Sequence, residues 1–109
     1  MTLQEREARA CAIIDSMAEE LRDISLYLHD NPELGLNEHK AVKVINQFLE
    51  THNFTSQVGL TDFPELQTAL RGDYNSTAQH KIAFLGEYDA LPELGHGCGH
   101  NLIAMMLSL

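Results

Sequence analysis

A continuous apolar run, formed by Ile82, Ala83, Phe84 and Leu85, limits the possible folds of this chain more than any other feature. An unbroken run of this kind is typical of a strand covered on both faces, because a strand with one face in water alternates apolar and polar residues. Two segments with helical periodicity precede the run, and the apolar sequence NLIAMMLSL, which is typical of a helix start, follows it. We therefore predict an α/β fold in which helices cover a sheet.

The two helices are predicted from the spacing of their apolar residues. The first carries a stripe that recurs at intervals of three and four, formed by Ala10, Ile14, Met17, Leu21, Ile24 and Leu28. It should end at Asn31-Pro32, because the residue before a proline is pushed out of the helical region. The second should begin near Asn37 as its N-cap. Its expected core stripe is Ala41, Val44, Ile45 and Phe48.

Two further strands are expected between the second helix and the apolar run. They correspond to residues 54–60 and 66–71, although their apolar and polar residues alternate imperfectly. Pro64 limits where the second of them can start, because proline cannot donate a ladder hydrogen bond. The turn sequence GDYNS then leads toward residues 82–85.

Length, charge and cysteine content exclude several classes of protein. The 109 residues suffice for one small domain and not for two. Sixteen acidic residues against 7 Lys and Arg give a formal net charge of −9, so no nucleic-acid partner is expected. Cys11 and Cys98 form no disulfide framework, the N-terminus lacks an apolar signal core, and no apolar run reaches membrane-spanning length. We expect a cytoplasmic protein with no membrane partner.

The glycine-rich sequence GHGCGHN, residues 95–101, carries the chemistry of the chain. A dinucleotide-binding G-x-G-x-x-G loop is excluded because His100 stands where the last glycine would be required. A cysteine nucleophile remains open, because Cys98 lies just before a helix start, where backbone N–H groups lower a thiol pKa. A solvated surface turn also remains open.

Metal binding is the third interpretation of this sequence, and it fits the donor types. In an extended loop residues i and i+2 project to the same side, so Cys98 and His100 could converge. Thiolate and imidazole donors suit zinc, cobalt or manganese. Glu87 and Asp89 could orient a ligand histidine by hydrogen bonding to it without binding the metal themselves. Two ligands are fewer than the three expected of a protein metal site, so spacing alone does not decide between the interpretations.

Two segments of the chain resemble one enzyme family. EYDALPELGHGCGHNLIA, residues 87–104, resembles the metal-binding segment of the M20 metallopeptidase family, in its amidohydrolase and dipeptidase branch, which includes aminobenzoyl-glutamate hydrolase-like proteins. LHDNPELGLNEHKA, residues 28–41, resembles the N-terminal H-x-x-P-E-L-x-x-x-E turn between the first two helices of that family. The resemblance spans the whole chain but only the first part of a typical member.

Carried over to this chain, the resemblance implies that Cys98 and His100 are ligands of a centre with two divalent ions (zinc, manganese or cobalt). Asp89 falls at an active-site aspartate that orients a ligand or helps to hold the ions. Glu33 and Glu38 fall in the N-terminal turn, where a structural role is expected rather than a catalytic one.

Three more residues are expected to support the ligands without binding metal, namely His96, Glu87 and Asn101. Glu87 stands where many relatives have Asp, which leaves its role open. Asn101 stands where related amidohydrolases often have Asp, and this departure favours the dipeptidase-like branch.

The implied activity is metal-dependent hydrolysis of an amide bond in a dipeptide or an N-acyl amino acid, by an enzyme that forms homo-oligomers. Residues 1–109 would be the N-terminal portion of one layered α/β/α catalytic domain, without the lid or dimerisation domain, and inactive alone. Two alternatives stay open. One is a non-catalytic short isoform that binds a partner through its apolar residues 103–109, and the other is a thiol-dependent hydrolase that uses Cys98.

Overall fold

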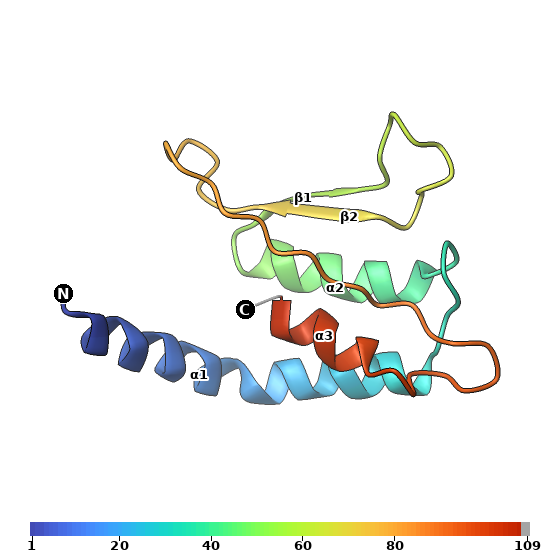
Figure 1. Cartoon of the computed structure of the whole chain (residues 1–109), viewed down its shortest axis with the longest axis horizontal. Coiled ribbons are helices and arrows are strands. Elements are labelled where there is room, and N and C mark those ends of the chain that lie inside the picture. The colour runs from blue at the N-terminus through green and yellow to red at the C-terminus, as the bar shows by residue number, and fades with distance from the viewer. Residues whose placement is uncertain (108–109) are drawn as a thin grey trace.

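The structure, a computed structural model, describes residues 1–107 and contains three helices and a two-stranded sheet (Figure 1). The elements follow the order α1 (Leu3–Asp30), α2 (His39–Thr51), β1 (Thr55–Val58), β2 (Leu70–Asp73) and α3 (His100–Leu107). The mixed α/β class predicted from the sequence is confirmed. Within residues 1–107, no helix is both long enough and apolar enough to cross a membrane.

Both ends of helix α1 are fixed by residues next to them in the sequence. Thr2 and Glu5 form a capping box, in which the Glu5 backbone N–H donates to Thr2 Oγ1 at 3.1 Å and the Thr2 N–H donates to Glu5 Oε2 at 2.6 Å. The helix ends at Asp30 with Asn31 as its C-cap, as the following Pro32 predicted. Its N-terminal half projects beyond the other elements (Figure 1), so the predicted core stripe is wrong at Ala10 and Ile14, which are exposed.

Helix α2 begins two residues after the predicted N-cap. Its N-cap is Glu38 instead of Asn37, and the Glu38 side chain makes no capping hydrogen bond. The carboxylate of Glu33 satisfies the first amides, accepting from the Lys40 N–H at 2.9 Å and from the Ala41 N–H at 2.8 Å. A cap supplied from outside the helix leaves no signal in the sequence of the helix itself, which explains the error.

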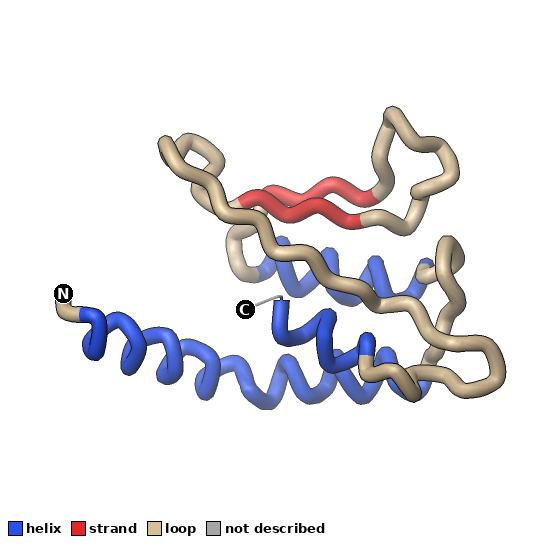
Figure 2. The backbone as a smooth tube through the Cα atoms, in the orientation of Figure 1, coloured by secondary structure: helices blue, strands red, loops and turns tan. Residues whose placement is uncertain are grey.

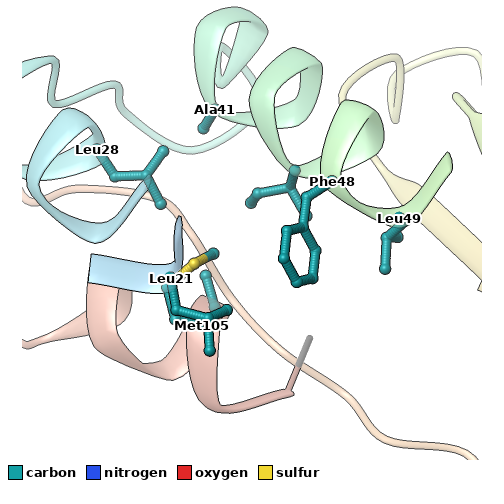
Figure 3. Close-up of a cluster of buried hydrophobic side chains, with 8 residues drawn as sticks. Leu21, Leu28, Ala41, Phe48, Leu49 and Met105 are labelled. Atoms are coloured by element: carbon teal, nitrogen blue, oxygen red, sulfur yellow. The ribbon is translucent and has the colours of Figure 1, made fainter. Parts of the chain in front are cut away.

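The core lies where the three helices meet (Figure 3), and Leu70 of β2 packs against it. Helix α3 packs against α1, and α2 contacts both α1 and the two strands. The buried apolar cluster comprises Leu21, Leu28, Ala41, Ile45, Phe48, Leu49, Ala104 and Met105. Of the predicted α2 stripe only Val44 is not fully buried.

The two strands form an antiparallel hairpin that is shorter than the sequence predicted. Thr55 pairs with Asp73 and Val58 with Leu70. Residues 60–69 form turns, and the Gly59 N–H donates to the Ala69 carbonyl at 2.7 Å to close this long connection. The strand expected at 54–60 contains β1 and is too long at both ends, whereas the strand expected at 66–71 overlaps β2 only at Leu70 and Arg71 and is wrong elsewhere.

The strand predicted at residues 82–85 does not form. The whole segment between β2 and α3 is loop (Figure 2), and among the described residues nothing pairs with the backbone of 82–85. Ile82, Phe84 and Leu85 are 83%, 75% and 90% exposed, so the prediction of a strand covered on both faces is wrong for this structure. Apolar composition favours a strand only where neighbouring strands and covering elements exist.

Candidate metal and hydrolase site

The loop of residues 87–100 is attached to the turn between α1 and α2. The Ala90 N–H donates to the Glu33 carbonyl at 2.7 Å, and Leu34 and Ala90 form an isolated parallel bridge. A tight turn follows, in which Leu91 and Gly95 exchange two backbone hydrogen bonds of 2.9 and 3.0 Å. The two segments that resembled one family in the sequence therefore touch in the structure.

Gly99 turns this loop into helix α3. Its φ of 82° lies in the left-handed region that glycine adopts without steric cost. Its N–H donates to the His96 carbonyl at 3.0 Å, and its own carbonyl accepts from the N–H groups of Leu102 and Ile103. Helix α3 accordingly starts at His100, one residue before the expected start, and this fixes the His100 backbone at a helix N-terminus.

The His100 imidazole lies between two carboxylates. Its Nδ1 is 2.8 Å from Asp89 Oδ1 and 3.1 Å from the Asp89 carbonyl oxygen, while its Nε2 is 2.9 Å from Glu87 Oε2. The imidazole is mostly buried and Glu87 is exposed. A carboxylate that accepts from one ring nitrogen fixes the orientation and tautomer of a histidine, which is how metal-binding histidines are supported.

Cys98 takes no part in this group. It lies in a turn instead of an extended segment, and it is exposed. The expectation of an extended loop through Cys98 and His100 is therefore wrong, because Cys98 lies in a turn and His100 begins α3.

His96 lies within this loop and is buried, and its Nδ1 has no hydrogen-bond partner among residues 1–107. Burial lowers the pKa of the His96 imidazole below its ordinary value. The nearby His29 and His100 lower this pKa further, while Asp89 and the Leu28 backbone act in the opposite direction. A neutral imidazole at this place suits the supporting role that the resemblance implied.

Asn101 serves to attach α3 to α1. Its buried side-chain amide donates to the Ser25 carbonyl at 3.3 Å and to Ser25 Oγ at 3.2 Å. The interaction aligns the helix that begins with His100, so Asn101 acts on the loop through helix packing.

A buried polar chain next to the loop was not anticipated. Thr68 Oγ1 donates to the Glu38 carboxylate, and the Tyr88 hydroxyl donates to the Thr68 carbonyl. Burial, with a smaller contribution from Glu38, raises the pKa of Tyr88 to about 12. The spacing of Glu33 and Glu38 in the N-terminal turn was the available sequence signal, whereas nothing in the sequence distinguished Thr68.

The donor types of the loop suit a divalent ion, because a thiol, two imidazoles and three carboxylates occur within residues 87–100. Within residues 1–107, however, no three His, Cys, Asp or Glu side chains are placed so that they could hold a metal ion. The described residues therefore offer part of a ligand set: an exposed thiol, and a histidine that is already oriented by Asp89.

The chain is similar to several curated hydrolases. It is 35% identical over 105 residues to Xaa-Arg dipeptidase of Homo sapiens and 40% identical over 102 residues to the mouse (Mus musculus) protein of the same name, with 88% of this chain matched in both. It is 30% identical over 107 residues to one of the subunits of p-aminobenzoyl-glutamate hydrolase of Escherichia coli, with 83% of this chain matched. The chain spans about a quarter of the length of these relatives, 24%, 24% and 21% respectively. No protein-family model matches it.

Proposed function

We propose that the protein containing this chain hydrolyses amide bonds with divalent metal ions. The chain is a homologue of dipeptidases and amidohydrolases, consistent with its resemblance to the M20 metallopeptidase family. The observation that carries the proposal is the Asp89 carboxylate 2.8 Å from Nδ1 of His100, at the first residue of α3. This contact leaves Nε2 of His100 as the atom to bind a metal, in place of its present contact with Glu87.

In this proposal Cys98 and His100 are the ligands that residues 1–107 contribute, and Asp89 orients His100. Glu87, His96 and Asn101 support the loop. Zinc, manganese or cobalt, two ions in all, would supply Lewis-acid polarisation of the substrate carbonyl and an acidified water. The remaining ligands and a general base would come from other parts of the protein, because this chain spans only about a quarter of its relatives.

The proposed substrates are dipeptides and N-acyl amino acids. Two of the relatives carry the name Xaa-Arg dipeptidase and another is named for p-aminobenzoyl-glutamate. Dipeptides that end in arginine are thus the first compounds to test, followed by acidic dipeptides and p-aminobenzoyl-glutamate. We extend the proposal to a homo-oligomeric protein without nucleic-acid or membrane partners.

The experiment measures hydrolysis of this panel by the natural protein before and after chelation, and after adding back each metal. Variants Cys98→Ala and His100→Ala are compared with Cys11→Ala and His80→Ala, which remove the same side chains from exposed positions away from the loop. We expect chelation and both loop variants to lower kcat/KM at least a hundredfold, with both controls unchanged.

Two outcomes would contradict the proposal. Activity that survives chelation but is lost in Cys98→Ala would identify a thiol-dependent hydrolase. A protein with no hydrolytic activity and no bound metal would favour the non-catalytic interpretation. For that interpretation, the proposed partner-binding end is already partly occupied, because Ala104 and Met105 are buried in the core; Ser108 and Leu109 lie outside the described residues.

A further inference from the structure

Asp89 is held from both of its neighbours along the chain. The Ala90 N–H donates to the backbone carbonyl of Glu33. The Tyr88 hydroxyl donates to the carbonyl of Thr68, whose own hydroxyl donates to the carboxylate of Glu38. Both glutamates belong to the turn between α1 and α2. We propose that Glu33 and Glu38 are positioning residues for Asp89 and, through Asp89, for His100. This proposal rests on the proposed function, which it deepens by naming what fixes the geometry of the site.

The first connection runs through Glu33. Its carboxylate accepts both from the Lys40 N–H, at 2.9 and 3.0 Å, and from the Ala41 N–H at 2.8 Å, at the N-terminus of α2. A carboxylate at a helix N-terminus is favoured by the unpaired N–H groups and by the helix dipole. The backbone carbonyl of the same residue accepts from the Ala90 N–H at 2.7 Å. One residue therefore joins a helix end to the residue after Asp89.

The second connection runs through Glu38. Its buried carboxylate accepts from the Leu36 N–H at 3.0 Å and from the Thr68 hydroxyl. The Thr68 carbonyl in turn accepts from the Tyr88 hydroxyl, so the residue before Asp89 is tied to the same turn. A buried carboxylate is costly unless it is fully bonded, so its placement here points to a specific role in holding these groups.

Gly35 lies next to the carboxylates of Asp89 and Glu38. A Cβ atom at this position would be 3.9 Å from Asp89 Oδ2 and 4.0 Å from Glu38 Oε1. The turn of residues 31–38 thus passes directly beside Asp89 as well as holding its neighbours. The two ties restrain the chain on both sides of Asp89, so the backbone that carries its side chain is held at two points.

The test uses the natural protein with Glu33→Gln and Glu38→Gln, which keep the side-chain shape and remove the charge. Glu65→Gln, on the exposed connection between β1 and β2, is the matched control. Tyr88→Phe cuts the second connection without touching a glutamate. We expect Glu33→Gln, Glu38→Gln and Tyr88→Phe each to lower kcat by about ten- to a hundredfold with KM changed less than about threefold, which is the range for residues that support metal ligands.

A second readout does not depend on catalysis. Glu33→Gln leaves the carbonyl that accepts from Ala90 in place, so faster hydrogen exchange of the Ala90 amide would report loosening through the lost anchor alone. We expect exchange at least about tenfold faster at Ala90 in Glu33→Gln, and a shifted His100 imidazole signal in all three variants. Exchange in the centre of α1 should not change.

The outcomes separate this proposal from the proposed function. Variants that unfold at lower denaturant concentration, yet keep kcat, Ala90 exchange and the His100 signal, would overturn the positioning role and leave two structural glutamates. If the unaltered protein neither binds metal nor hydrolyses the panel, the proposed function fails. The exchange and imidazole measurements would then still decide whether Glu33 and Glu38 position Asp89.

Discussion

At the scale of single residues, Asp89 is the residue that orients the imidazole of His100. It contacts Nδ1 of His100 with both its carboxylate and its backbone carbonyl, and so defines which ring nitrogen remains available. We expect Asp89→Asn to lower both divalent-metal affinity and kcat/KM by about ten- to a hundredfold, because the amide can no longer hold the imidazole with a charged acceptor.

This expectation is measured on the natural protein by competition with a chromogenic chelator and by steady-state kinetics. Asp62→Asn, in the exposed connection between the strands, is the control for a generic change of charge. Unchanged metal affinity in Asp89→Asn would show that His100 is oriented by other contacts or binds no metal.

Tyr88 gives the molecule an alkaline signature. Burial raises the pKa of its hydroxyl to about 12 in the folded chain against 10.0 ordinarily, because burial disfavours the phenolate. The unfolded state therefore loses this proton first, so the stabilisation is fully present below about pH 10 and is lost as the pH rises through about 12. At about 1.4 kcal/mol per pKa unit the full effect would be about 3 kcal/mol, and we expect roughly half because the side chain is only partly buried.

The corresponding measurement compares Tyr88→Phe with the unaltered protein by urea denaturation between pH 9 and 12. The difference in free energy of unfolding between the two proteins should shrink as pH rises through this range. Tyr27→Phe, the same change at an exposed tyrosine of α1, is the matched control. A pH-independent difference for Tyr88→Phe would mean that its hydroxyl is not shielded from water.

At the scale of the elements, α1 contributes to the core through its second half only. Leu28 is 1% exposed and packs with α2 and α3, whereas Leu26, two residues earlier, faces solvent. We expect Leu28→Ala to lower the free energy of unfolding by about 2–5 kcal/mol through lost burial and a residual cavity. Leu26→Ala, the same change on the same helix, should cost less than about 0.5 kcal/mol. Equal urea midpoints for the two variants would contradict the packing described.

The elements also show what the sequence could predict. The end of α1 at Asn31-Pro32 was correct, and so was the buried stripe of α2 except at Val44, because both depend on chemistry within a few residues. The start of α2 was misplaced because its cap comes from Glu33, outside the helix. In the site, the sequence indicated that Asp89 could orient a ligand histidine, but it did not predict the turn at Gly99, because that turn depends on how the loop joins α3 in three dimensions.

At the scale of the whole molecule, the helices are better packed than the sheet. The three helices share one core, while the hairpin is only two strands wide, and residues 82–85 cross the surface without a strand partner among the described residues (Figure 2). Ile82, Phe84 and Leu85 of the apolar run that dictated the α/β prediction are thus the most exposed large apolar residues of the described part of the chain. A segment forms a strand only if it has other strands to pair with, whatever its sequence favours. The apolar run alone therefore could not determine whether residues 82–85 form a strand.

This exposed run leads to a prediction about the behaviour of the 109-residue chain by itself. Ile82, Phe84 and Leu85 are apolar and exposed, and within residues 1–107 the backbone N–H and C=O groups of 82–85 have no hydrogen-bond partner, so they can pair with other chains. We expect concentration-dependent self-association and binding of a hydrophobic dye, both strongly reduced by Phe84→Lys, because a charge on an exposed edge opposes pairing. Leu26→Lys, which places the same charge at an isolated exposed leucine of α1, should leave both unchanged. Light scattering over a concentration series measures the self-association. If the unaltered chain is monomeric, or if the two substitutions have equal effects, residues 82–85 are not the surface through which the chain self-associates.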